Sequence, residues 1–329
     1  MGWDSVPWFT EGGAEHSSEV ARLLAYAAFS GSEGTIGSAD LQVRALASPA
    51  AAVQILPGAC AILNRAAGAT YQAYAGRLPV AEQIPIAGTG AAARSDLIVA
   101  RIENPNSYGE TWPNPSNPAT GPYVFTRVIS GVPATTKSVR QIRPTDSAIT
   151  LARIDIPANT STVTGSMVKD LREMANPRRR RVVRAVRGVF PADEVGNVRN
   201  PEWEEFPNGC RWPIEIPEWA TSATVMVTWA GLNQRNAKDS YGYLRGNLGG
   251  LLTPNSVYDV NWVGNPIRVH CMAGGSVSIP AAMRGTVQDL VMEGSGYAGT
   301  NIQGVLEANT GSSMFADVEF VESAQEDSF

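Results

Sequence analysis

Residue types that carry catalysis are sparse in this chain of 329 residues. It has two histidines, His16 and His270, and three cysteines, Cys60, Cys210 and Cys271, with no C-x-x-C spacing. The Walker lysine motif, H-E-x-x-H and G-x-S-x-G do not occur in it. We therefore expect no catalytic residue, no metal, no disulfide framework and no cofactor.

Carboxylates are the catalytic residue type that the second half of the chain has in number. A glycoside hydrolase needs only two acids. The candidates are Glu202, Glu204, Glu205, Glu215, Glu218, Asp239, Asp259 and Asp289. One sequence does not show which of them lie close together, and acidic residues on a solvated face explain them equally well. Glycan hydrolysis by a carboxylate pair therefore stays an alternative function.

Aromatic side chains beside polar ones suggest a different chemistry. Sugar rings have apolar C–H faces and hydroxyls that need hydrogen-bond partners, so rings and polar groups together suit them. The segment from Trp229 to Tyr241 has both kinds on an expected loop. The candidate ligand-binding residues are Trp229, Asn233, Gln234, Arg235, Asp239, Tyr241 and Tyr243. For any single tryptophan, Trp229 included, a place in the core is the competing interpretation.

Charge is distributed unevenly along the chain. The net charge is −5, but residues 188–329 contain seven basic and seventeen acidic residues, a net charge of −10. Just before them, ANPRRRRVVRAVR has six arginines. A solvated junction between two domains is one interpretation, and an interface made by Arg178, Arg179, Arg180 and Arg181 is the other. A nucleic-acid partner is not expected, because the acidic segment that follows would repel phosphate.

Composition favours short strands over long helices. Only 17 % of residues are charged, and 32 Gly and 22 Pro make turns frequent. One helix is predicted from Ser17 or Ser18 to Gly31, because Val20, Leu23, Leu24, Ala27 and Ala28 form an apolar stripe that should pack on a sheet. A second short helix is predicted over 165–175.

Extended runs make up the rest of the first half. Five short strands are predicted as a β-meander at 41–47, 51–56, 59–64, 72–78 and 83–87, and three stronger ones at 96–102, 123–129 and 149–156. A Pro- and Asn-rich excursion, residues 103–122, follows the first strong strand, and a long irregular loop of this kind is often functional.

Nine further strands are predicted in the second half. They lie at 181–187, 211–216, 223–229, 241–247, 257–263, 267–272, 286–293, 302–308 and 314–321. Their regular spacing is typical of a sandwich or jelly roll. The expected fold is mainly β: an antiparallel β domain with two short helices at 1–176, an Arg-rich junction at 177–188, and a jelly-roll-like β-sandwich at 189–329.

Several segments together resemble a known family. They are PWFTEGGAEHSSEVARLLAYAAFSGSEGTIGSADLQVRAL, VQILPGACAILNRAAGATYQAYAGR, RSDLIVARIENP, GPYVFTRVISGVP and ITLARIDIPANTSTVTGSMVKDLREMANPRRRR. In order and spacing they resemble the N-terminal module of minor tail proteins of siphophages that infect actinobacteria, over about the first 180 residues. WPIEIPEWATSATVMVTWAG, SIPAAMRGTVQDLVMEG and FADVEFVE are more loosely similar to the β-sandwich modules that follow in such proteins.

The resemblance implies a virion component near the tail tip or baseplate. The first module would dock to other tail proteins, and the second would face the host and bind an envelope glycan or pack within the tip. By analogy the chain would be a homo-oligomer, a trimer, without catalytic activity. We expect assembly in the host cytoplasm and no membrane insertion, because the first residues resemble no signal peptide and no run is long and apolar enough to cross a bilayer. A purely architectural module with no ligand is a third possibility.

Overall fold

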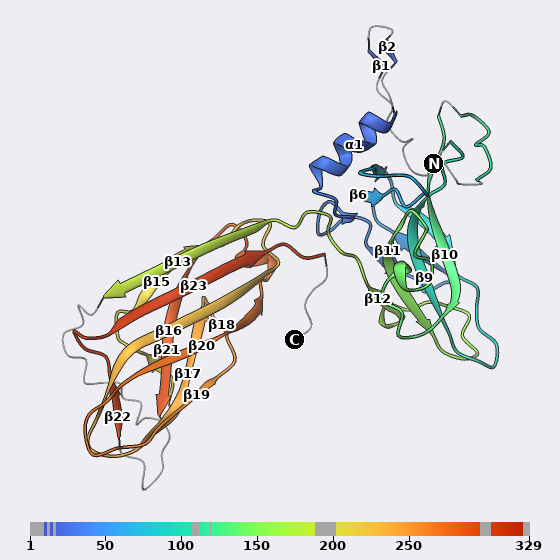
Figure 1. Cartoon of the computed structure of the whole chain (residues 1–329). Helices are drawn as coiled ribbons and strands as arrows, with labels where there is room; N and C mark the ends of the chain where they lie inside the picture. The colour runs from blue at the N-terminus through green and yellow to red at the C-terminus, as the bar shows by residue number, and fades with distance from the viewer. Residues whose placement is uncertain are drawn as a thin grey trace. The chain divides into compact units, whose positions relative to one another are not determined.

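The chain folds into two compact units (Figure 1). The computed structural model describes residues 10–11, 14–15, 18–106, 112–118, 120–187, 202–296 and 304–324. The first unit extends to Pro177 and takes in Ser323 and Ala324, and the second runs from Arg178 to Glu322. Nearly all of the described secondary structure is β-strand in antiparallel sheets, so the predicted fold class is confirmed.

Three antiparallel sheets and a short two-stranded pair, β1-β2, build the first unit. The sheets have the orders β10-β9-β11-β12, β3-β6-β7 and β4-β5-β8. The strands are β1 Thr10–Glu11, β2 Ala14–Glu15, β3 Gly34–Thr35, β4 Val43–Ala45, β5 Ala52–Ile55, β6 Gly58–Leu63, β7 Ala73–Leu78, β8 Glu82–Pro85, β9 Arg94–Ile102, β10 Val124–Val132, β11 Ala148–Ile156 and β12 Val168–Asp170. The five early strands are present as predicted. The meander is wrong, because β4, β5 and β8 belong to one sheet and β6 and β7 to another.

Strand β9 is the centre of this unit. It pairs with β10 on one side and β11 on the other. Ile98, Ala100 and Ile102 join the main core, whereas Leu97 and Val99 join a second apolar cluster on the opposite face. Because both faces of β9 are covered, its run DLIVARI is apolar almost throughout instead of alternating.

Helix α1 (Ser18–Ala28) lies where it was predicted but presents a different face to the unit. Val20, Leu23 and Leu24 are 53 %, 48 % and 60 % exposed, so the expectation that this stripe packs on a sheet is wrong. Arg22 is the buried residue of the helix: its Nε donates to Gln72 Oε1 at 2.5 Å. The hydrogen-bonding partners of Arg22 lie on the sheet side, and this outweighs the apolar periodicity.

The second predicted helix is wrong. Residues 165–175 form a 3₁₀ turn, Gly165–Met167, and then strand β12, which pairs with β11. Met167 and Leu171 pack against the clusters on the two different faces of the sheet. A short run with apolar residues at helical spacing is ambiguous, and here pairing with β11 decides it. One other 3₁₀ turn described in this unit spans Val139–Gln141.

Two antiparallel sheets form the second unit. The strands are β13 Arg179–Arg187, β14 Glu204–Glu205, β15 Arg211–Glu215, β16 Ser222–Arg235, β17 Ser240–Leu248, β18 Leu251–Leu252, β19 Ser256–Val260, β20 Arg268–Ser278, β21 Val287–Gly296, β22 Val305–Glu307 and β23 Ser313–Val321, with a 3₁₀ turn at Ala281–Met283. Each of the nine predicted strands has a counterpart. Residue 302, where one was expected to begin, lies outside the described residues.

The connectivity of these strands is that of a jelly roll. One sheet has the order β13-β23-β16-β20; in the other, β21 and β17 are central, with β15 beside β21 and β19 beside β17. If the eight principal strands are counted along the chain, the orders are 1-8-3-6 and 2-7-4-5, two interlocked Greek keys. The described core of the unit includes Trp229, Phe206 and Phe320.

The arginine-rich segment is not a linker. Residues Arg179–Arg187 form β13, which runs beside β23 in register over nine residues (Figure 1). The expected junction over 177–188 is therefore wrong: apart from Gly188, which lies outside the described residues, it is the first strand of the jelly roll and its approach. The inward-facing residues Val182 and Val186 pack on the core and tie this strand to the unit.

Candidate functional site

Two of the predicted ligand-binding residues are unavailable to a ligand. Trp229 on β16 is fully buried, and its indole Nε1 donates to the Phe206 carbonyl at 2.8 Å. Gln234 is also fully buried, and its amide donates to the carbonyls of Lys238 and Val260 at 3.1 and 2.9 Å. The predicted strand ended at Trp229 and a loop was expected after it, but β16 continues to Arg235, and Trp229 takes the place in the core that was its competing interpretation. The ligand-binding prediction is therefore wrong for these two residues.

Three other predicted residues brace the same end of the jelly roll. Asn233 Nδ2 and Arg235 Nη1 contact the two carboxylate oxygens of Glu307 at 3.2 and 3.0 Å. The Glu307 side chain is only 3 % exposed, so these contacts hold β22 against β16. Asp239 Oδ1 accepts the backbone N–H of Trp262 at 2.7 Å. These side chains make contacts within the chain and do not converge on one point.

Tyr241 and Tyr243 open a row of outward-facing side chains on β17. Their rings meet edge to face, with centroids 5.9 Å apart. Strand alternation places Arg245 and Asn247 on the same outer face, while Gly242, Leu244, Gly246 and Leu248 face the core. The last two outward residues were not predicted as site residues.

Arg245 is fixed from two directions. Its Nε donates to Glu293 Oε2 at 2.7 Å, and its guanidinium lies 3.8 Å from the ring centroid of Trp203. Asn247 Nδ2 donates to the other oxygen of Glu293 at 2.6 Å. We call Trp203, Tyr241, Tyr243, Arg245, Asn247 and Glu293 the aromatic–polar face. All six side chains are half-buried.

A second carboxylate lies next to this face. Glu205 on β14 is directly opposite Glu293 on β21, so their Cα atoms are about 5 Å apart. Among the strand pairings of the described residues, Glu205 and Glu293 are the one pair of acidic residues directly opposite each other. Arg211 binds Glu205, with Nε 3.3 Å from Oε1, and also lies 3.7 Å from Asp289. Charges on this sheet therefore alternate in sign and largely neutralise one another.

The four predicted interface arginines are all paired within the second unit. Arg178 contacts both oxygens of Glu322 at 2.7 and 2.8 Å; Arg180 lies 2.9 Å from Glu215. Arg179 lies 3.9 Å from Glu319, and Arg181 Nε donates to Asp317 at 2.8 Å. The hydrogen bond from Arg181 holds the pKa of Asp317 below its usual value. The strand is therefore not a free basic patch.

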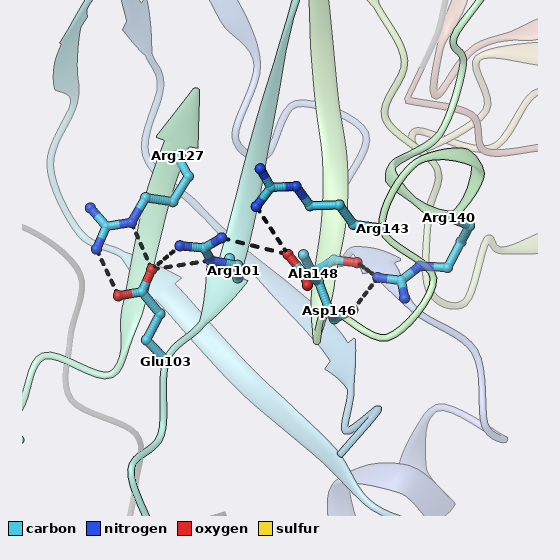
Figure 2. A network of polar contacts seen from close by, with 7 residues as sticks. All are labelled: Arg101, Glu103, Arg127, Arg140, Arg143, Asp146 and Ala148. Atoms are coloured by element: carbon cyan, nitrogen blue, oxygen red, sulfur yellow. Dashed lines mark hydrogen bonds and ion pairs between the residues drawn. The ribbon is translucent and has the colours of Figure 1, made fainter. Parts of the chain in front are cut away.

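In the first unit, a polar network gathers where the irregular excursion leaves β9 (Figure 2). Glu103 is 8 % exposed and accepts a bidentate pair from Arg127, at 2.7 and 2.7 Å, and a 3.1 Å hydrogen bond from Arg101 Nε. Burial on its own would raise the pKa of Glu103, but the hydrogen bonds from Arg127 and Arg101 outweigh it and the pKa is lowered.

This network continues towards β11. Arg101 Nη1 and Arg143 Nη1 lie 3.5 and 3.8 Å from Asp146. Arg140 donates to the carbonyls of Asp146 and Ala148 (Figure 2). The Arg101 guanidinium also lies 4.6 Å from the ring centroid of Trp112, in the excursion itself. The network therefore clamps the base of the excursion to β9, β10 and the start of β11.

The three cysteines are buried or half-buried, and one of them lines a hollow in the second unit. Burial raises the pKa of the Cys60 and Cys210 thiols to about 12 and that of Cys271 to about 11, so these thiols stay protonated at neutral pH. A hollow of about 480 Å³ lies between β19 and β20, lined by Tyr258, His270 and Cys271 among others. Across the described ranges, no group of three or more His, Cys, Asp or Glu side chains could hold a metal ion. No described helix is long and apolar enough to cross a membrane.

Comparisons with known proteins give no relative. No protein-family model and no curated protein matches the sequence. A VP2 subviral particle of infectious bursal disease virus is 9 % identical over 89 % of this chain and 70 % of that chain, with a TM-score of 0.23. T=1 particles derived from the same virus are 11 % identical over 88 % of this chain and 72 % of that chain, with a TM-score of 0.21. The insecticidal delta-endotoxin Cry8Ea1 from Bacillus thuringiensis is 10 % identical over 89 % of this chain and 51 % of that chain, with a TM-score of 0.22. Similarities with TM-scores this low carry no argument about fold or function.

Proposed function

We propose that this chain is a structural protein of a virus particle, a subunit of a phage tail tip or baseplate. It acts in tail assembly and in attachment to the host cell, and it is not an enzyme. Its partners are other tail proteins and further copies of itself. It is assembled in the host cytoplasm and carried in the virion.

The observation that carries this proposal is the resemblance over the first 180 residues to minor tail proteins of siphophages. The five segments quoted above span most of the first unit and follow one another in the family's order. Within this unit they form the central strand β9, its neighbours β10 and β11, and strands β5 to β7. The resemblance therefore extends over the elements that form the core of the unit.

The jelly roll supports a role in attachment. This architecture occurs in viral capsid and lectin domains, where sheet faces and loops meet partners. Because a fold does not determine a function, the argument depends on the surface of the domain. The aromatic–polar face offers rings and fixed polar groups on an open sheet.

Exposed apolar side chains support assembly. Val20, Leu23 and Leu24 on α1 are about half exposed, and so are Phe315 and Met272 on the outer face of the β13-β23-β16-β20 sheet. Monomeric soluble proteins rarely expose contiguous apolar patches larger than a few hundred Å². We propose a homo-oligomer, a trimer by analogy with the resembling proteins.

A cryo-EM map of the intact virion tests the function. We expect density that fits both units at the distal end of the tail, repeated by the tail symmetry. A map in which every tail protein is assigned and none of the density fits this chain would contradict the proposal.

A tail-associated glycan hydrolase is the second candidate. The observation that favours it is the cross-strand pair Glu205 and Glu293, since direct pairing places two carboxylate side chains next to each other on one face of a sheet, and a retaining glycosidase needs two neighbouring carboxylates. The test is release of reducing sugar from purified host envelope. Activity that disappears in both Glu205→Gln and Glu293→Gln would favour the hydrolase; no release by the wild-type chain favours the non-enzymatic function.

A further inference from the structure

We infer that the aromatic–polar face of the jelly roll binds an uncharged saccharide chain. This inference deepens the proposed attachment function by naming the surface and the ligand class. It depends on the chemistry of six side chains on neighbouring strands and not on the identity of the virus.

The geometry of β17 fits a chain-like ligand. Residues on one face of a strand recur about every 7 Å, so the row from Tyr241 to Asn247 extends for about 20 Å, the length of a few sugar rings. The aromatic members lie at one end of this row and the polar members at the other. Trp203 lies beside the polar end because its ring stacks on Arg245.

Hydrogen-bonding groups remain available on the face. Arg245 uses Nε for Glu293, and neither of its terminal nitrogens makes a hydrogen bond within the described part of the chain. The hydroxyl of Tyr243 also makes no hydrogen bond there. Glu293 accepts one hydrogen bond on each oxygen, which leaves further lone pairs. Vicinal sugar hydroxyls require donors and acceptors side by side in this way.

The polar groups are held in place before a ligand arrives. Arg245 is fixed between the Trp203 ring and Glu293, and Asn247 is fixed by Glu293 and by the backbone N–H of Gly250, which donates to its Oδ1 at 2.7 Å. Ordering these side chains therefore costs little when a ligand binds. An accidental surface cluster would leave the same groups free to move.

The charge balance selects the ligand class. Arg245 is matched by Glu293, and Arg211 lies between Glu205 and Asp289, so two guanidinium groups and three carboxylates alternate at this place and the sheet has no excess of positive charge. A polyanion such as a phosphate-linked polymer would meet the carboxylates, and a polycation would meet the guanidinium groups. An uncharged saccharide makes use of both without a charge penalty.

The test is binding of the full-length chain to an array of oligosaccharides. The probes are neutral oligomers of glucose, galactose, mannose, rhamnose and arabinose, together with glucuronate and glycerol-phosphate oligomers as anionic probes. We expect binding to at least one neutral oligomer, weakened at least tenfold by Tyr243→Ala and by Arg245→Ala. The matched control is Phe315→Ala, which removes an exposed ring from the outer face of the other sheet and should leave binding unchanged. Melting curves show whether each variant is folded.

Three results of this binding experiment would overturn the inference. Binding to no neutral oligomer excludes the ligand class, and binding to the anionic probes alone assigns the face to a polyanion. Neutral binding that survives both substitutions places the site elsewhere. Sugar binding by a chain that is absent from the virion tail would contradict the proposed function but not this inference, so the two failures can be told apart.

Discussion

Glu103 is the residue on which the polar network of the first unit depends. Its carboxylate is 8 % exposed and receives hydrogen bonds from two arginines on two strands. Removing one partner of a buried ion pair is costly because the remaining charges stay in a poorly solvated place. Glu103 is also the first residue after β9, so the network fixes the point at which the excursion begins.

Substitution of Glu103 should therefore destabilise the first unit. We expect Glu103→Gln to lower the free energy of unfolding by about 2–3 kcal/mol, because Arg127 loses the carboxylate that binds it and Arg101 keeps only its 3.5 Å contact with Asp146. The matched control is Arg143→Gln in the same network: Arg143 is 47 % exposed and makes one 3.8 Å pair, so it should cost less than about 0.5 kcal/mol. Urea denaturation measures both, and equal costs would contradict the network's role.

The same carboxylate makes stability depend on pH. The pKa of Glu103 is lower in the folded chain than in the unfolded chain. Its contribution is therefore fully present above the unfolded value of about 4.3 and is lost as the pH falls through the folded value. We expect Glu103→Gln to flatten the loss of stability between about pH 5 and pH 2. Parallel acid-unfolding curves for wild type and variant would be the contrary result.

Substitution of Trp229 should lower the stability of the second unit without affecting saccharide binding. Trp229→Phe leaves the buried Phe206 carbonyl without its donor and removes ring volume, so we expect a loss of about 2 kcal/mol in stability. Saccharide binding should stay within twofold of wild type, because the ring is fully buried. Calorimetry and the oligosaccharide array measure the two effects. A folded Trp229→Phe variant that fails to bind would return this residue to the ligand site.

The sequence predicted part of the candidate site because the signal is local. Tyr241 and Tyr243 were found from their aromatic character and polar neighbours. Arg245 and Asn247 could have been found from the alternation in SYGYLRGNL, where every second residue faces outward. Glu293 and Trp203 could not, because Glu293 reaches the face through pairing of β21 with β17 across 48 residues of chain, and Trp203 through pairing of the adjoining β14 with β21 across about 90. Register over that distance is a tertiary property.

At the scale of elements, local sequence patterns predicted where most strands lie, but they did not predict which face of the helix is buried or which strands pair. Runs bounded by Gly, Pro and Asn mark the longer described strands of both units, whereas β12 was predicted as a helix and the two-residue strands were not predicted. The face that α1 presents was wrong, because periodicity shows that a stripe exists and not what covers it. The jelly-roll order was expected only as a class, since it depends on which distant strands pair, as β13 pairs with the last strand, β23.

The exposed stripe of α1 gives a prediction about stability. We expect Leu24→Ala to change the free energy of unfolding by less than about 0.5 kcal/mol, because Leu24 is 60 % exposed and alanine is a good helix former. The same substitution at Leu78 on β7, which is fully buried, should cost about 2–5 kcal/mol. A large cost at Leu24 in the isolated chain would mean that the stripe is covered.

At the scale of the whole molecule, the apparent contrast in charge disappears. Residues 188–329 have a net charge of −10, but the second unit as it folds, 178–322, has thirteen basic and fifteen acidic residues, a net charge of −2. Arg179, Arg180 and Arg181 of β13 pair with acidic residues of β23 and β15. Low and balanced charge suits subunit contacts, because few charges have to be desolvated.

Self-association follows from the proposed tail function and from the apolar side chains that a single chain exposes. We expect light scattering after size exclusion to give a mass three times the 34.9 kDa of one chain, with dissociation on dilution. Two double variants locate the contact: Leu23→Lys with Leu24→Lys, and Met272→Lys with Phe315→Lys. The variant that alters the contact surface should have a lower mass in solution. Neither variant should change the melting temperature of the monomer, because all four side chains are exposed. A wild-type mass of one chain at every concentration would contradict self-association. It would leave attachment to other tail proteins as the way in which these surfaces are covered.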